Sequence, residues 1–542
     1  MTKTRNLKFI VLTTSILFAT LMLCACVQQD NKIKDGVFPN TVAENAKIDE
    51  KYKSVSEELS KDAINEFMNN ITKIPRLPGE EKVIKDYIKT WATNNNLKAI
   101  EDKSGCLYID VPATQGYENY PKVILQGHLD MVGTTADGNI DMHKTPVDAV
   151  YDEKDGTIMS KDNKTTIGAD DGEGIVTMLS IAKNKDVKHG PLRLLFTYEE
   201  ETTMNGAKLL SPEVLDAPYL INIDCGPVGV LIESSAGGLI FDLESTQETE
   251  TVSKNIVTIG ISDLKGGHSA AEITKPRMSA HDVDKKILNK LNENSISYNL
   301  VSWNGGTATN SITVKSELTL AVEAKNTDKI KSLSEEVFNK MKEQCTDDKD
   351  ASIEFTDNGV KTVTAFTKAS TQGILEALND IPQGVIKEDP EYKDTPITSC
   401  NTGVINFIDG NVHAGIYFRS SEESAIVEMN SKIENFRDKY KVNYKITNRF
   451  PAWPKSEKNT LTKMFVSAYK NAMNIEALET KIHGGLECSF LYQKKPDIEI
   501  ACIGADVKGE HATTETFYTK SLPAHFASIL YTLDHINETK EG

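Results

Sequence analysis

The sequence of 542 residues contains no pair of cysteines at C-x-x-C spacing. Beyond residue 26 its cysteines are widely scattered, at Cys106, Cys225, Cys345, Cys400, Cys488 and Cys502. This excludes a zinc-thiolate knuckle and a thioredoxin-like redox site. The chain also lacks basic charge, since its formal net charge is −18, and such an acidic surface argues against nucleic acid as a partner. No internal repeat is evident, and the length predicts roughly two to four domains.

The N-terminal apolar run lacks the length of a membrane-spanning helix. It covers residues 9–23, follows Lys3, Arg5 and Lys8, and ends in L-C-A-C, whereas a spanning helix prefers ~20 residues. This resembles a bacterial lipoprotein signal, which predicts a signal peptide over residues 1–25 and a lipid on Cys26. The expected location is extracytoplasmic, with the N-terminal lipid anchoring the chain to the bacterial cell membrane. An uncleaved N-terminal anchor is the alternative, and the polar residues 26–60 are interpreted as a tether.

From residue 61 the sequence alternates between helical and strand patterns. Predicted strands at 106–111, 123–125, 192–197 and 219–223 and helices at 83–91 and 175–181 indicate an α/β domain with a mostly parallel sheet. After residue 238, strands at 256–261, 314–322 and 415–418 alternate with helices at 283–291 and 330–341, which predicts an α+β insert. The α/β alternation of the first segment returns with a helix at 461–472, a strand at 498–503 and a helix from 522. We therefore expect one discontinuous domain (61–238 and 441–542) interrupted by a second domain (239–440).

A histidine and an aspartate stand where one predicted strand ends. Residues 123–132 read V-I-L-Q-G-H-L-D-M-V, so His128 and Asp130 follow an apolar strand. In open α/β sheets ligands bind at the carboxyl ends of strands. Because residues two apart in an extended chain point to the same side, Asp130 is placed to hold the second ring nitrogen of a metal-binding His128. The alternative is a strand-end histidine that is only hydrogen-bonded.

Further acids and a second histidine border other apolar segments. The candidates are Asp170 and Asp171 before the helix at 175–181, Glu199, Glu200 and Glu201 after the strand at 192–197, Asp224 after the strand at 219–223, and His511 beyond the strand at 498–503. Because each follows or borders a strand end, we expect them to converge on one edge of the sheet. Two histidines with several carboxylates suit Zn²⁺, Mn²⁺ or Co²⁺. For Asp170 and Asp171 the alternative is an acidic helix N-terminus, which the helix dipole favours.

The order of the motifs resembles the M20 family of metallopeptidases, and within it the aminoacyl-histidine dipeptidase branch. The resemblance covers nearly everything from residue 61 to the end. The matching segments are G-H-L-D-M-V at 127–132, I-G-A-D-D-G-E-G at 167–174, M-N-G-A at 204–207, L-I-N-I-D at 220–224, G-G-H-S at 266–269, N-G-G-T-x-x-N at 304–310, H-G-G-L-E-C at 483–488, and His511 with Glu515 at the family's spacing.

The resemblance implies a catalytic domain with two divalent metal ions, Zn²⁺ foremost and Mn²⁺ or Co²⁺ as alternatives. His128 and Asp224 would hold one ion, Glu201 and His511 the other, and Asp170 would bridge them. The M-N-G-A segment sets the register of the preceding glutamates, so that Glu200 is the general base. Asp130 would orient His128 without touching metal. Sequence alone does not distinguish among the three neighbouring glutamates.

The resemblance also makes the insert a lid and dimerisation domain. His268 would donate to the tetrahedral oxyanion, either from a partner subunit of a homodimer or after domain closure. The implied substrate-binding residues are Asn310, Arg419, His483 and Glu487, with Arg419 clamping a free carboxylate through its bidentate fork. An ordinary loop histidine is the alternative for His268, and a surface salt bridge is the alternative for Arg419.

The implied function is hydrolysis of Xaa-His and other unblocked dipeptides, with a short peptide as substrate. Two metals can lower the pKa of a water and polarise the scissile carbonyl, while a general base moves the proton. An M20-type deacylase of N-acyl amino acids would use the same centre and differ in its pocket. A peptide-binding lipoprotein without activity is the third interpretation, although it would tolerate loss of Glu200 and of metal ligands, and here all are present. The segments N-G-G-T-x-x-N and H-G-G-L-E-C favour the dipeptidase.

Overall fold

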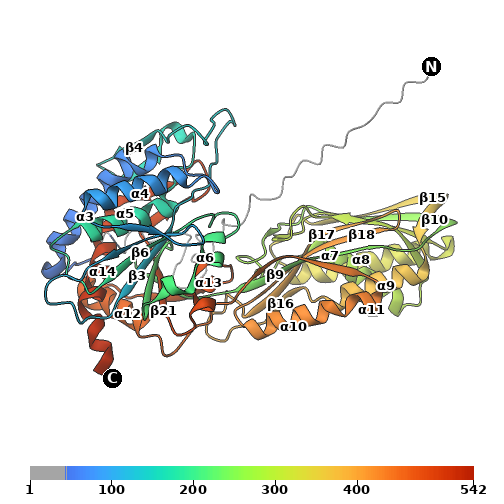
Figure 1. Ribbon diagram of the computed structural model, residues 1–542. Helices are drawn as coiled ribbons and strands as arrows, with labels where there is room; N and C mark the ends of the chain where they lie inside the picture. Colours follow the sequence, from blue (N-terminus) through green and yellow to red (C-terminus); the bar gives the residue numbers. More distant parts are fainter. Residues whose placement is uncertain (1–42, 44–45, 542) are drawn as a thin grey trace, which may run out of the picture.

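The computed structural model describes residue 43 and residues 46–541, and it shows two lobes side by side (Figure 1). The first lobe is built on a mixed eight-stranded sheet, in which the central strands β6, β3, β7 and β21 run parallel. In spatial order its strands are β1 (Ala99–Glu101), β2 (Leu107–Val111), β6 (Leu192–Thr197), β3 (Val123–His128), β7 (Tyr219–Ile223), β21 (Glu499–Ile503), β8 (Val230–Ser235) and β20 (Leu478–Ile482). This confirms the predicted α/β class.

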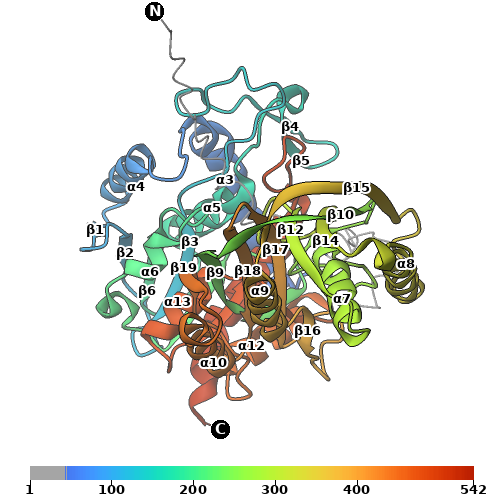
Figure 2. The same cartoon turned by 90° about the vertical axis from the view of Figure 1, so that its right-hand side faces the viewer.

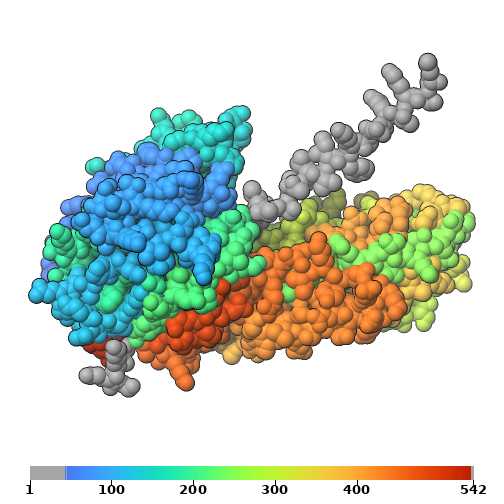
Figure 3. Space-filling model, in the orientation of Figure 1, coloured from blue at the N-terminus to red at the C-terminus, as the bar shows by residue number. Residues whose placement is uncertain are grey.

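Helices pack on both faces of the first sheet and enclose a core of its apolar strands. These helices are α3 (Glu50–Asn69), α4 (Lys82–Asn94), α5 (Ala169–Lys183), α6 (Asn205–Leu209), α12 (Thr460–Met473), α13 (Glu487–Lys494) and α14 (Leu522–His535). A small sheet of β22 (Asp506–Lys508), β23 (Thr516–Tyr518), β5 (Thr157–Ser160) and β4 (Ala149–Asp152) lies beside it. The early and late parts of the chain, blue and red, share this lobe (Figure 3).

The second lobe is a nine-stranded sheet with helices on one face and a separate hydrophobic core (Figures 1 and 2). Along the sheet lie β15 (Ser352–Phe366), β10 (Thr249–Ser262), β14 (Ser316–Val322), β12 (Tyr298–Gly305), β17 (Thr398–Ile408), β18 (Asn411–Ser420), β9 (Gly237–Thr246) and β19 (Asn443–Phe450), with β16 (Gly384–Lys387) paired to β17. The helices are α7 (Ala280–Glu293), α8 (Thr327–Gln344), α9 (Lys368–Asp380), α10 (Glu423–Glu434) and α11 (Phe436–Tyr440). A separate pair joins β11 (Gly267–His268) to β13 (Ser311–Ile312).

Two sequence expectations about segment limits differ from the structure. Residues 50–60, assigned to a tether, form the first half of α3, because Tyr52 and Leu59 bury a sparse apolar stripe against the first lobe. The predicted boundary at residue 440 falls before β19, which still pairs with β9 in the second sheet. The rest of the predicted tether and the predicted signal peptide with Cys26 lie outside the described residues. Within residues 46–541, no helix is both long enough and apolar enough to cross a membrane.

A charged contact joins the two lobes beside the connecting strands. The segment between β16 and β17 carries Glu391 and Tyr392, which meet Lys455 and Glu233 of the first lobe. Lys455 Nζ lies 2.9 Å from Glu233 Oε1 and 2.7 Å from Glu391 Oε1, and the Tyr392 hydroxyl donates to Glu233 Oε1 at 2.6 Å. Because Glu233 is buried, Lys455 supplies the charge that makes its burial tolerable.

Candidate metal centre

The carboxylate of Asp170 lies between two histidines. His128 Nε2 is 3.0 Å from Asp170 Oδ1, and His511 Nε2 is 3.0 Å from Asp170 Oδ2. His128 ends β3, Asp170 is in the first turn of α5, and His511 follows β22, so three segments far apart in the sequence meet here. One carboxylate therefore presents a separate oxygen to each histidine, which is the arrangement that a bridging ligand requires.

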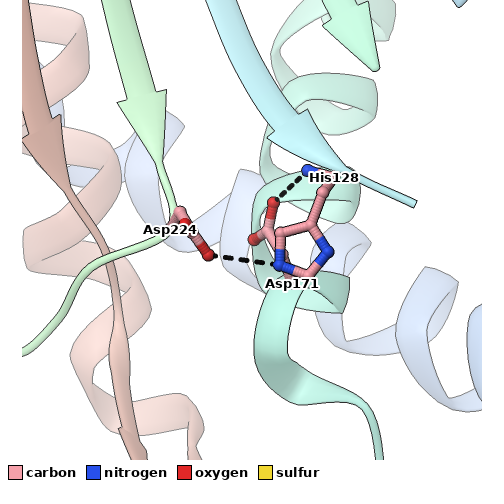
Figure 4. Close-up of side chains that lie close together, drawn as sticks. All are labelled: His128, Asp171 and Asp224. Atoms are coloured by element: carbon pink, nitrogen blue, oxygen red, sulfur yellow. Dashed lines mark hydrogen bonds and ion pairs between the residues drawn. The ribbon is translucent and has the colours of Figure 1, made fainter. Parts of the chain in front are cut away.

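Each histidine also faces a second carboxylate. Asp224 Oδ1, just after β7, is 3.4 Å from His128 Nε2, and Glu201 Oε1, just after β6, is 3.1 Å from His511 Nε2. Figure 4 shows Asp224 directed at the ring of His128. The side chains predicted from five separate motifs thus come together at one edge of the sheet, as two histidine–carboxylate pairs that share Asp170.

The electrostatics of this cluster fit a site for cations. Burial raises the pKa of Glu201 to about 7 and that of Asp224 to about 6. Burial also opposes the charge of His511, but Glu201 and Asp170 outweigh it and raise the pKa of His511 to about 11. The buried carboxylates therefore need positive charge beside them, which divalent cations with N/O ligands would supply.

The three consecutive glutamates point in different directions. Glu199 has a left-handed backbone (φ 53°), and its Oε2 accepts hydrogen bonds from Thr203 Oγ1 and Asn205 Nδ2, both at 2.7 Å. Glu200 instead turns toward the centre, where its Oε2 is 4.0 Å from His128 Nε2. Since Glu201 contacts His511, the geometry supports the register in which Glu199 stands outside the centre.

Asp130 contacts three residues of the centre through its carboxylate. Its Oδ1 is 3.5 Å from His128 Nδ1, and its two oxygens accept the backbone N–H groups of Glu200 and Glu201, each at 3.0 Å. One carboxylate thus holds the turn that carries both glutamates and lies beside the ring of His128. That it orients this ring for a metal, as the H-x-D spacing predicts, stays a prediction.

Asp171 is close to the centre but has both oxygens engaged elsewhere. Its oxygens accept the backbone N–H groups of His128 at 2.8 Å (Figure 4) and of Gly174 at 2.9 Å. Gly127 permits this approach, because a Cβ there would lie 2.2 Å from Asp171 Oδ2. The donor atoms of His128, Asp171 and Asp224 lie within 4.8 Å of one another. Because both oxygens of Asp171 already accept backbone N–H groups, we interpret Asp171 as a residue that holds the backbone in place and Asp170 as the ligand candidate.

Two charged residues that position the centre were not predicted from the sequence. The buried guanidinium of Arg76 donates to the carbonyls of Leu129 (2.8 Å), Asp130 (2.6 Å) and Gly168, and so joins the end of β3 to the start of α5. The buried carboxylate of Glu515 accepts four consecutive backbone N–H groups, from Ile167 (2.7 Å), Gly168 (3.0 Å), Ala169 (2.8 Å) and Asp170 (3.2 Å). The His–Glu spacing at 511–515 was the available signal, but it assigns no role to Glu515.

Arg419 and His268 of the second lobe form a group with His483, which follows β20 of the first lobe. Arg419 is 1% exposed and its guanidinium carbon lies 3.5 Å from the ring centroid of Tyr417, so the alternative of a surface salt bridge is wrong. His483 Nε2 is 2.7 Å from Ser399 Oγ, and Ser399 pairs with Arg419 across β17 and β18. Burial and the nearby charge of Arg419 lower the pKa of His268 to about 3, so this imidazole is neutral at pH 7.

Asn310 and Glu487, two further predicted substrate residues, lie in different lobes. The carbonyl of Asn310 accepts the N–H of Ser269 at 2.8 Å, beside the strand pair that carries His268. Glu487 Oε2 accepts hydrogen bonds from Gln126 Nε2 at 2.8 Å and Thr197 Oγ1 at 2.6 Å. Because Glu487 is 1% exposed and touches β3 and β6, it lies behind the metal centre.

The fold and this set of donors define a metallopeptidase. The chain belongs to the peptidase family M20/M25/M40, whose model matches residues 124–535. It is 28% identical over 476 residues to the cytosol non-specific dipeptidase of Escherichia coli, covering 87% of this chain and 97% of that protein. The crystal structure of aminoacylhistidine dipeptidase from Vibrio alginolyticus matches it with a TM-score of 0.80 and 26% identity, over 87% of this chain and 96% of that one. A segment of 78 residues is 41% identical to peptidase T of Citrobacter koseri, covering 14% of this chain and 19% of that protein.

The comparison corrects the predicted location. The E. coli relative, which this chain matches over 97% of its length, is by name a cytosol enzyme. The expected extracytoplasmic location with a lipid anchor on Cys26 is therefore wrong. That expectation depended on the composition of fewer than thirty N-terminal residues, whereas the similarity to the cytosol enzyme extends over 476 residues.

Proposed function

We propose that this protein is a metal-dependent dipeptidase that hydrolyses Xaa-His and other unblocked dipeptides. The observation that carries the proposal is Asp170, whose two oxygens each lie 3.0 Å from a different histidine. The similarity to a cytosol non-specific dipeptidase and to an aminoacylhistidine dipeptidase, each over 87% of this chain, supports the substrate class.

Two divalent ions fit the donors that the chain provides. His128 and Asp224 would hold one ion, His511 and Glu201 the other, and Asp170 would contact both. Zn²⁺ is the foremost candidate, with Mn²⁺ and Co²⁺ as alternatives, because all donors are imidazole nitrogens or carboxylate oxygens. When bound, such ions polarise the scissile carbonyl and lower the pKa of the attacking water.

Glu200 is the proposed general base. It is buried beside the centre, and burial raises the pKa of its carboxyl well above the usual range, whereas nearby cations would favour its ionised form. As a carboxylate it would accept a proton from the attacking water and deliver it to the leaving amine. Asp130 holds the backbone of Glu200 and so places this carboxylate relative to His128.

The second lobe would bind and orient the substrate. The permanent charge of Arg419 suits the free carboxylate of a dipeptide, and His268 would donate to the oxyanion that forms at the scissile carbonyl. Asn310 of the second lobe and His483 and Glu487 of the first lobe complete the proposed substrate group. The division into a catalytic domain, a lid domain and a homodimer belongs to the same proposal, and sedimentation equilibrium of the full chain tests the dimer.

The function is tested by hydrolysis of a small substrate panel. The chelated chain, restored with Zn²⁺, Mn²⁺ or Co²⁺, should cleave Xaa-His and other free dipeptides and leave N-acetylated amino acids intact. Cleavage of the N-acyl amino acids instead would support a deacylase, since the two activities share the centre and differ in the pocket. No cleavage of any panel member with all three metals would refute the proposal.

The base is tested by Glu200→Gln with Glu199→Gln as the matched control. Loss of a positioned general base lowers the rate typically by ~10²–10⁴-fold, so Glu200→Gln should lose activity to that extent while its metal content stays near that of the wild type. Glu199→Gln, at a carboxylate bonded to Thr203 and Asn205, should keep most of the activity. Retained activity in Glu200→Gln would contradict the assignment.

A further inference from the structure

Three potential metal ligands meet on the second sheet, far from the centre described above. Asp242 and Glu244 lie two residues apart on β9, and His413 on β18 pairs directly with Glu244. Their neighbours Phe241, Leu243, Val412 and Ala414 point into the hydrophobic core. Because side chains alternate along a strand, Asp242, Glu244 and His413 all project from the opposite face. Along β18, His413 is six residues from Arg419, or roughly 20 Å.

The donor atoms of these three side chains converge. One donor atom from each of Asp242, Glu244 and His413 lies within 4.8 Å of the other two. His413 Nε2 is 3.5 Å from Asp242 Oδ1, which is longer than the 2.7–3.2 Å of an N–H···O hydrogen bond. Two ligands of one tetrahedral ion with bonds of about 2.0–2.1 Å lie about 3.3 Å apart. The pair is therefore spaced as ligands of one ion are, and the His128–Asp224 pair has the same spacing, 3.4 Å.

Asp242 and Glu244 make no close ion pair with a lysine or arginine among residues 46–541. No lysine or arginine nitrogen lies within 4.0 Å of their carboxylate oxygens, although Lys445 on β19 stands opposite Asp242 in the sheet register. The residue opposite Asp242 on β18 is Gly415, where a Cβ would lie 3.4 Å from Asp242 Oδ1 and 2.8 Å from Thr309 Cγ2, so the missing side chain leaves room here for the methyl group of Thr309. Asp242 is half-buried, which limits the competition of water for its charge.

We propose that Asp242, Glu244 and His413 form a third divalent-metal site, independent of the proposed dipeptidase centre. One imidazole and two carboxylates are an N/O set that suits Zn²⁺, and water would complete the coordination. The ion would cross-link β9, which begins the second lobe, to β18, which carries Arg419. Its role is structural, because none of its three ligands belongs to the proposed substrate group.

The test counts the ions that the full chain binds. Protein stripped with a chelator is dialysed against micromolar Zn²⁺, and bound zinc is measured by mass spectrometry. The wild type should bind three ions per chain, and His413→Ala should bind two with dipeptidase activity unchanged. The matched control is His143→Ala, since His143 is also exposed and pairs with one carboxylate, Glu80, at 3.0 Å. This control should keep three ions.

Asp242→Asn provides a second variant, and circular dichroism confirms that each variant is folded. It should lose the same ion as His413→Ala. Equal zinc content in the wild type and both folded variants would overturn the proposal, as would a third ion that binds only at millimolar zinc. The measurement compares the zinc content of the wild type with that of each variant. A difference of one ion therefore tests the third site even if the chain does not hydrolyse dipeptides.

Discussion

Replacing Glu515 by glutamine should weaken the metal centre without touching any proposed ligand. The carboxylate accepts four backbone N–H groups over residues 167–170, at 2.7 to 3.2 Å, two on each oxygen. Glutamine keeps one oxygen and places an NH₂ group against the other two donors. A hydrogen bond to a charged group contributes about 1.5–3 kcal/mol, so the loss of two should cost about 3–6 kcal/mol in the free energy of unfolding.

The same change should lower metal affinity, because these bonds fix the backbone of Asp170. Loss of a group that orients a metal ligand typically weakens binding by ~10–100-fold. Competition with a chromogenic zinc chelator measures the affinity, and denaturant unfolding of the chelated chain measures the stability. Glu457→Gln, at an exposed glutamate, is the control and should change neither. A Glu515→Gln chain that is less stable but binds both ions with wild-type affinity would refute the positioning role.

Two further predictions concern pH. Burial raises the pKa of Asp284 to about 7 in the folded chain, against 3.8 ordinarily. Its contribution to stability is therefore full below about pH 4 and is lost as the pH rises toward 7, by roughly 4 kcal/mol. Asp284→Asn, which keeps an acceptor for the Trp303 indole N–H, should flatten this dependence in urea unfolding between pH 4 and 8, and an unchanged slope would contradict the cause. Separately, zinc affinity should rise from pH 6 to 8, because the ion must displace protons held by a cluster in which Glu201 and Asp224 have pKa values of about 7 and 6. Calorimetric titration measures this, and a pH-independent affinity would speak against these residues as ligands.

Local periodicity predicted where elements lie better than which face they bury. The strands at 192–197 and 219–223 have the predicted limits, because short, mostly apolar segments match buried strands. In α4, however, the helix predicted over 83–91 has five apolar or aromatic residues at helical spacing, of which Val83 is 58% exposed while Ile84, Ile88 and Trp91 are buried. Helical spacing defines a stripe of apolar residues, but only the neighbouring elements determine which edge of it is covered.

The sequence by itself determined the chemistry of the centre, since a metal site needs particular residue types and strand ends are recognisable from local apolar runs. Local patterns made His128, Asp170, Glu201, Asp224 and His511 candidates together with neighbouring acids, and the family resemblance chose among them. Only the tertiary structure decided what holds them. Glu515 contacts residues about 345 positions away, and Asp242 meets His413 through strand register. Local patterns report the geometry of neighbouring residues, whereas the choice of partner across hundreds of residues depends on how the sheets and helices pack.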